Sequence, residues 1–111
     1  MTQQVTINLN YPGEDSQAIK IELVGVEQSW YDVLCLALSR GLIEKLDIRY
    51  FGDADVVDSL GIGVAQINQL ADRRGWMLMY NLNGVPGTTS VHKTPVNPGD
   101  VTSWYLADGY R

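Results

Sequence analysis

The chain has 111 residues, enough for one domain with its own core and too few for two. Apolar residues make up 45% of it and charged residues 19%, which excludes a largely disordered chain. The formal net charge is -5, and the eight Lys and Arg residues are scattered. This balance disfavours contact with a phosphate backbone, so no nucleic-acid partner is expected.

Cysteine content and the N-terminal residues bear on the cellular setting. Cys35 is the single cysteine, so no internal disulfide can form, and we interpret it as a small buried hydrophobe. Residues 1–4 lack the basic stretch and apolar run of a signal peptide. No segment carries the roughly 18 apolar residues that span a bilayer, so no membrane insertion is expected. We expect either a cytoplasmic protein or a mature domain with a replaced start.

Two alternating segments open the chain. Val5, Ile7 and Leu9 alternate with polar residues, and the same period of two recurs over residues 19–23. Residues 12–15, Pro-Gly-Glu-Asp, supply turn residues between the two segments. The pattern predicts a β-hairpin.

A helix is predicted over about residues 29–40. Ser29 and Asp32 form a variant of the capping box, and Gly41 suits a left-handed helix terminator. Between them the apolar residues follow helical spacing, at Trp30, Val33, Leu34, Ala37 and Leu38.

Residues 42–72 give a weaker pattern. Ile48, Tyr50 and the pair Val56-Val57 indicate short strands around the polar turn at residues 52–55. The segment Gly61-Ile62-Gly63 then predicts a break in any regular element.

The last third of the chain predicts two strands. Residues 76–82 alternate, with Trp76, Leu78, Tyr80 and Leu82 on one face and Met77 and Met79 on the other. Asn83-Gly84 predicts a tight turn, and Pro98-Gly99-Asp100 predicts a second turn before a strand over 101–106. The order β-β-α-β-β-β predicts an α+β fold of the ubiquitin-like β-grasp type, in which a mixed sheet curls around one main helix, in a single domain of residues 1–111.

An ordered set of segments between residues 19 and 106 resembles the C-terminal β-domain of the vitamin B12 carriers transcobalamin and intrinsic factor. It is more closely similar to bacterial domains of unknown function related to that β-domain. The segments are Ser-Trp-Tyr-Asp-Val-Leu at 29–34, a hydrophobic-Gly stretch at 56–62, Gly-Trp-Met at 75–77 before Asn83-Gly84, Pro-Gly-Asp-Val at 98–101, and Trp104-Tyr105.

The chain departs from this pattern by two extra residues before Asn83-Gly84. An even insertion keeps every side chain of a strand on its original face, so the predicted fold is unaffected. The insertion bears on the following loop at residues 85–96, and on any ligand contact made there.

The resemblance implies a module that covers a ligand, because in the carriers this β-domain packs over a corrin held by a larger helical domain. It implies cobalamin as a candidate ligand, and a secreted or cell-surface location.

Trp76 is the residue that we expect to contact a ligand. It follows Gly75, its ring is large enough to stay partly exposed, and the predicted fold brings it close to the loop at Gly61-Ile62-Gly63. Glycines there would permit close backbone approach to a ligand, although tight turning alone also explains them. The other aromatic residues are expected to build the core or its rim. The predicted ligand-binding set is Trp76, Met77, Leu60, Gly61, Ile62, Gly63 and Val64.

Two further groups suggest chemistry but have simpler explanations. Asp53, Asp55 and Asp58 depart from the spacing of an EF-hand loop, and a solvated acidic turn explains them without a metal. His92 is the only histidine, and Ser90 and Asp100 could complete a triad, but no nucleophile elbow positions one. No metal site and no catalytic residue is predicted.

These observations favour a non-enzymatic small-molecule binding module that resembles the ligand-covering β-domain of cobalamin carriers. The alternative is a protein–protein interaction or adhesion domain of a larger surface protein, using a sheet edge or the face of Met77 and Met79. We do not expect a ubiquitin-like sulfur carrier or protein modifier, because such proteins need a C-terminal Gly-Gly and the sequence here ends in Asp-Gly-Tyr-Arg.

Overall fold

The computed structural model describes residues 3–51, 61–73, 75–87 and 90–108. It contains one α-helix, α1, over Trp30–Ser39, and a 3-10 helix, η2, over Val91–Lys93. The strands are β1 Gln4–Leu9, β2 Gln17–Glu22, β3 Leu46–Phe51, β4 Gly61–Ile67, β5 Leu70–Ala71, β6 Trp76–Leu82, β7 Val85–Pro86 and β8 Val101–Asp108.

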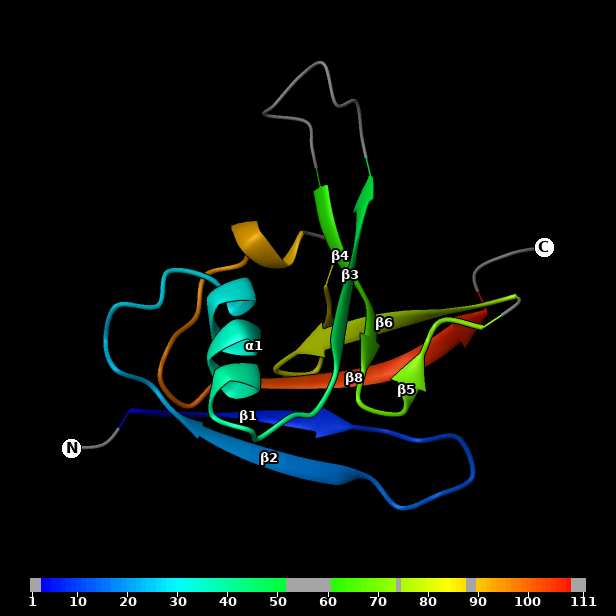
Figure 1. Ribbon diagram of the computed structural model, residues 1–111, viewed down its shortest axis with the longest axis horizontal. Coiled ribbons are helices and arrows are strands. Elements are labelled where there is room, and N and C mark those ends of the chain that lie inside the picture. The colour runs from blue at the N-terminus through cyan, green and yellow to red at the C-terminus, as the bar shows by residue number, and fades with distance from the viewer. Residues whose placement is uncertain (1–2, 52–60, 74, 88–89, 109–111) are drawn as a thin grey trace.

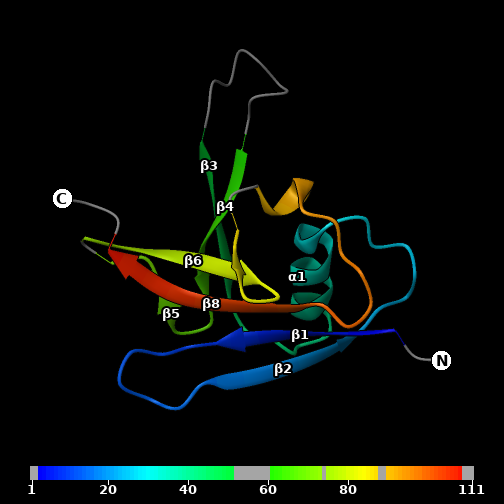
Figure 2. The same ribbon diagram turned by 180° about the vertical axis from the view of Figure 1, so that it is seen from behind.

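The strands form two sheets (Figure 1). The five-stranded sheet has the order β2-β1-β8-β6-β7, and the three-stranded sheet has the order β3-β4-β5. In the larger sheet β1 and β8 run parallel, whereas β1/β2 and β6/β8 run antiparallel. Figure 2, seen from behind, shows α1 and the β3/β4 hairpin on the same side of the larger sheet.

The predicted β-grasp fold, with a single mixed sheet curled around one helix, is therefore wrong. The strands divide between two sheets, and the second consists entirely of residues 46–71. These residues pair locally, β3 with β4 and β4 with β5, and bury their own apolar side chains at Val64, Ile67 and Leu70. Local antiparallel pairing thus replaces the expected incorporation of this segment into the main sheet.

The core lies between the larger sheet and the layer formed by α1 and the three-stranded sheet. It is one continuous cluster, and the alternation in the strands explains its composition, because every second residue of a strand faces the same side. From the larger sheet it takes Val5, Ile7, Leu9, Ile19, Ile21, Leu78, Tyr80 and Trp104, and from the opposite layer Trp30, Val33, Leu34, Ala37, Val64, Ile67 and Leu70.

The predicted opening hairpin and helix are confirmed. β1 and β2 pair antiparallel from Gln4↔Glu22 to Leu9↔Gln17. The Ser29 hydroxyl accepts from the Asp32 N–H at 3.4 Å, and the Asp32 carboxylate accepts from the Ser29 N–H at 3.2 Å. The two residues therefore form the reciprocal capping box that their spacing predicts, and Gly41 has the expected positive φ of 73°.

The C-terminal strands also agree with the sequence, but the glycine segment does not. Asn83 and Gly84 have φ of 52° and 83° and connect β6 to β7 as a two-residue turn. Gly61, Ile62 and Gly63, predicted to interrupt regular structure, instead form the start of β4 and pair with Phe51, Tyr50 and Arg49 of β3. The pair Val56-Val57 and the turn at 52–55 lie outside the described residues.

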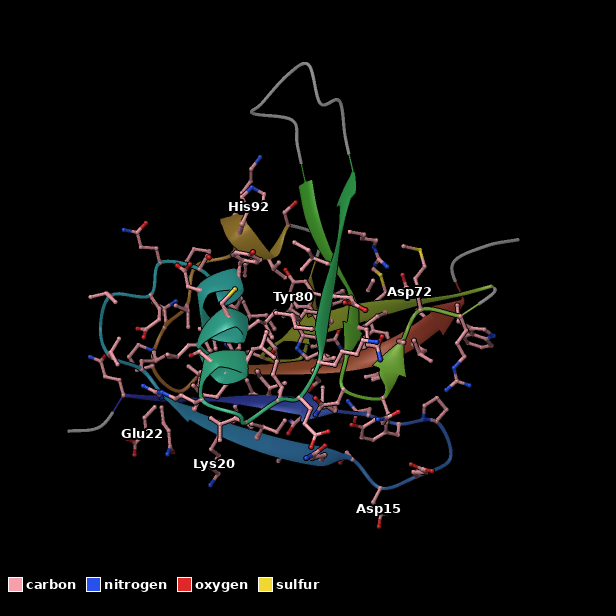
Figure 3. The ribbon with its side chains drawn as sticks, in the orientation of Figure 1. Asp15, Lys20, Glu22, Asp72, Tyr80 and His92 are labelled. Carbon is pink, nitrogen blue, oxygen red and sulfur yellow. The ribbon has the colours of Figure 1, made fainter. Side chains whose placement is uncertain are left out.

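The two sheets are joined by a polar clamp, defined here as Arg49, Asp72 and the backbone of Leu78. Arg49 from β3 forms an ion pair with Asp72 and donates to the Leu78 C=O at 3.1 Å. The Leu78 N–H, on β6, donates to Asp72 at 2.7 Å. Figure 3 shows Asp72 next to β5.

No helix of the described ranges is long and apolar enough to cross a membrane.

Candidate binding groove

A cavity of about 710 Å³ opens at one end of the larger sheet, where β1 stops and β8 continues. We call it the Trp76 groove. Side chains and backbone from the β1–β2 loop, the β5–β6 turn and the end of β8 line it, namely Asn10, Tyr11, Pro12, Arg73, Trp76, Tyr105 and Leu106.

A tight turn presents Trp76 and Arg73 to the groove. The N–H of each residue donates to the C=O of the other, at 2.8 and 3.0 Å, so the two residues are direct cross-strand partners. Gly75 makes this turn with φ of 82°, a conformation that suits glycine. Because cross-strand partners project from the same face, the indole and the guanidinium are held side by side.

Trp76 differs from the other two tryptophans in its exposure. The residue is 47% exposed, whereas Trp30 and Trp104 are fully buried. Trp104 packs against Tyr80 with ring centroids 4.9 Å apart. The prediction that Trp76 is partly exposed while most aromatic residues build the core therefore agrees with the structure.

The opposite wall of the groove is anchored by Asn10 and Tyr11. The Asn10 N–H and side-chain amide both donate to the Trp104 C=O, at 2.9 and 3.1 Å, and fix the point where the chain leaves β8. The Tyr11 hydroxyl donates to Gln17 at 3.2 Å. Burial raises the pKa of the Tyr11 phenol, and the charge of Glu14 raises this pKa further against a lowering by Asn68. The phenol is therefore a neutral donor at physiological pH.

The residues predicted to bind ligand are not all brought together. Val64 is buried in the core, and Gly61, Ile62 and Gly63 belong to β4 rather than to a loop beside Trp76. None of these four residues lines the Trp76 groove. Met77 follows Trp76 in β6, half-buried on the opposite face, and Leu60 lies outside the described residues.

Sequence reasoning missed the groove residues outside β6. Pro12 was predicted to lie in a turn, and neither Tyr11 nor Arg73 was singled out. Their convergence depends on the parallel pairing of β1 with β8, which brings the first and last strands together and which no local pattern indicates. The turn signal at Pro12 does mark where β1 must leave the sheet.

The other candidate groups lie away from the Trp76 groove or outside the described residues. The Asp100 carboxylate accepts from the Asn83 side-chain amide at 3.0 Å and from the Asn97 N–H at 2.9 Å, within the turn before β8. His92 lies on η2 (Figure 3), and its Nδ1 is buried without a partner among the described residues. Asp53, Asp55 and Asp58 lie outside the described residues, and Cys35 is half-buried on α1.

No family of known proteins matches this sequence, and no curated protein matches it either. The fold is similar to a crystal structure of a protein from Ruminococcus gnavus that carries a provisional metal-binding label. The TM-score is 0.65 at 15% identity, and the match covers 97% of this chain and 99% of that one. At this identity the likeness shows a shared fold only. None of these comparisons bears on the transcobalamin resemblance, which stays a prediction.

Proposed function

We propose that this chain is a non-enzymatic binding module and that the Trp76 groove is its ligand site. The observation that carries the proposal is the indole of Trp76, 47% exposed beside Tyr11 and Arg73 in a cavity of about 710 Å³. Ligand sites are typically concave, mostly apolar, and about 300–1,000 Å³ in volume, with a few polar groups that orient the ligand. The groove has these properties.

The groove chemistry favours a ligand with an apolar or flat face and a negatively charged group. Trp76 and Tyr11 offer aromatic surface, and the guanidinium of Arg73 can bind a carboxylate or phosphate in bidentate geometry. Within the described ranges the ion pairs are Lys45–Asp47 and Arg49–Asp72, so Arg73 is not engaged in one. A corrinoid, suggested by the transcobalamin resemblance, is the first small molecule to test.

The residues that the structure describes offer no support for metal binding like that named for the structural neighbour. No group of three or more His, Cys, Asp or Glu side chains in the described ranges could hold a metal ion. Metal sites in proteins need such converging ligands. The Trp76 groove itself is lined by one amide, aromatic rings, apolar side chains and a guanidinium, which is a poor set for a cation.

Binding can be tested by NMR through the indole N–H signals of the three tryptophans. We expect cyanocobalamin to shift the Trp76 signal and to leave those of buried Trp30 and Trp104 in place. Trp76→Ala should abolish binding, whereas Val85→Ala, at another exposed apolar residue outside the groove, should not. Binding that is equally strong in Trp76→Ala would place the ligand elsewhere and contradict the proposal.

A further inference from the structure

We infer that the Trp76 groove receives an extended peptide, which adds a strand to β8 by hydrogen bonding to the backbone of Leu106. This inference rests on the proposed function, because it uses the same groove and specifies the ligand. It derives from the way in which the larger sheet is left incomplete at the end of β8.

β1 covers only the first half of β8. The parallel pairing runs from Thr6↔Val101 to Leu9↔Trp104, and the last bond of the ladder joins the Asn10 N–H to the Trp104 C=O at 2.9 Å. β8 then continues to Asp108 with β6 as its partner on one side. Beyond the end of β1, Tyr105 and Leu106 of β8 line the groove.

The backbone of Leu106 points into this open side. Backbone groups of alternate residues in a strand face the same neighbour. The C=O groups of Asp100 and Trp104 accept from Thr6 and Asn10, so the even-numbered residues of β8 face β1. Leu106 is the next residue in this series and it lines the groove. No hydrogen bond joins its N–H or C=O to a described residue on this side.

The free edge at Leu106 contrasts with the outer edge of β6, where the same kinds of group are occupied. The backbone of Trp76 is hydrogen-bonded to Arg73, and the backbone of Leu78 is hydrogen-bonded to the side chains of the polar clamp. The Tyr80 C=O accepts from the N–H of Gly87 at 2.9 Å. Native sheets manage their edges in such ways because unpaired backbone attracts other strands. The open position at Leu106 is therefore a ready template for strand addition.

The residues that follow β1 do not fill this position. Asn10 is held to the Trp104 C=O by two hydrogen bonds, and the Glu14 N–H donates to the Tyr11 C=O, so the chain turns away at once. Pro12, in this turn, lacks an N–H that could extend the ladder. Because the chain turns away, the space next to Leu106 of β8 is left open and forms part of the Trp76 groove.

The walls of the groove suit an extended peptide. Extended peptides that add to a sheet gain affinity from main-chain hydrogen bonds and specificity from pockets for alternate side chains. Here Trp76 and Tyr11 offer aromatic contact to one side chain of the peptide. Exposed Arg73, which projects from the same face as Trp76, favours an acidic residue two positions away in the peptide. We therefore assign the ligand class as an extended peptide with an apolar and an acidic residue two positions apart.

The test uses the capped five-residue peptide Ser-Val-Ser-Glu-Ser, in which valine and glutamate share one face, added to the ¹⁵N-labelled full chain. We expect the Leu106 amide to exchange rapidly with solvent in the free protein and at least about tenfold more slowly with saturating peptide. The Trp76 indole signal should shift at the same concentrations. Arg73→Gln should lower the affinity for this peptide more than the affinity for a peptide in which serine replaces glutamate.

N-methylation of the peptide separates strand addition from side-chain stacking. Methyl groups on alternate amides remove donors from one edge of the peptide only. Blocking the edge that faces β8 should weaken binding by about tenfold or more, and blocking the other edge should not. Equal effects of the two N-methylated peptides, or an unchanged Leu106 amide at millimolar unmodified peptide, would overturn the inference. If a small molecule still shifts the Trp76 signal, the proposed function stands without it.

Discussion

Tyr11 makes one wall of the groove sensitive to alkaline pH. Its pKa lies above the usual 10.0 because of burial and the nearby charge of Glu14. A raised pKa means that the folded protein holds this proton more tightly than the unfolded chain does. The stabilisation from the neutral phenol is thus present below pH 10 and is lost as pH rises through the folded pKa.

We expect the Tyr11 phenol to titrate above the pH at which free tyrosine does. The absorbance of tyrosinate near 295 nm, measured for the wild type minus Tyr11→Phe, should rise at a pH above about 10. The free energy of unfolding should also fall more steeply above that pH in the wild type than in the variant. A difference titration at or below the ordinary pKa would contradict the burial of this ring.

Single residues differed in how far the sequence predicted their roles. Trp76 could be singled out because it precedes an alternating strand and follows Gly75, and its exposure agrees with that choice. Arg73 and Tyr11 could not, because each is an ordinary turn residue until the tertiary fold places it against the indole. Val64 was assigned to a loop, but its apolar side chain belongs to the core.

At the level of elements, α1 depends on its N-terminal cap. Ser29 is buried, and its hydroxyl and backbone N–H each form a hydrogen bond with Asp32. We expect Ser29→Ala to lower the free energy of unfolding by about 0.5–2 kcal/mol, because it leaves a helix N–H without a partner. Urea denaturation of the purified variants measures this.

The control for this prediction is a serine at the other end of the same helix. Ser39→Ala removes a hydroxyl that donates to the Leu36 C=O at an exposed position, so its cost should be within about 0.5 kcal/mol. Asp32→Ala combined with Ser29→Ala should cost less than the two single changes together, since they share one pair of hydrogen bonds. Strict additivity would show that the two side chains do not act as a capping box.

Elements with strong local signals were predictable, and those fixed by pairing were not. Ser29, Asp32 and Gly41 marked both ends of α1, and Asn83-Gly84 marked a hairpin. β4 was missed because Gly61 and Gly63 have a low preference for strands. Hydrogen-bonded pairing with β3 holds these glycines in an extended conformation, which glycine alone does not favour.

At the scale of the whole molecule, the polar clamp holds the two sheets together. Arg49 and Asp72 are mostly shielded from solvent, with side chains 24% and 31% exposed, and both bond to the β6 backbone. Removing one partner leaves a shielded charge and an unpaired backbone group, which is costly. The clamp therefore contributes to stability as a unit.

We expect Arg49→Met to lower the free energy of unfolding by about 1–3 kcal/mol. Asp72→Ala should in addition accelerate hydrogen exchange at the Leu78 amide, which loses its acceptor. Lys45→Met is the matched control, because Lys45 and Asp47 form an exposed pair at 3.9 Å that should contribute less than about 1 kcal/mol. Equal losses from Arg49→Met and Lys45→Met would show that the clamp has no special role.

The division into two sheets was the largest feature that the sequence did not predict. Residues 46–71 carry few alternating positions, so nothing in them specified whether they would join the main sheet or pair with one another. The parallel contact of β1 with β8 depends on residues more than ninety positions apart, for example Asn10 and Trp104. Such long-range pairing is set by the packed core rather than by local preference.

That contact has a consequence for how the protein is made. On the ribosome, β1 and β2 emerge well before β8, the strand that lies between β1 and β6. Until β8 has emerged, β1 has one edge paired with β2 and one unpaired edge. Pairings between distant segments also form slowly. We therefore expect the nascent chain to be prone to aggregation through the unpaired edge of β1 until β8 has emerged.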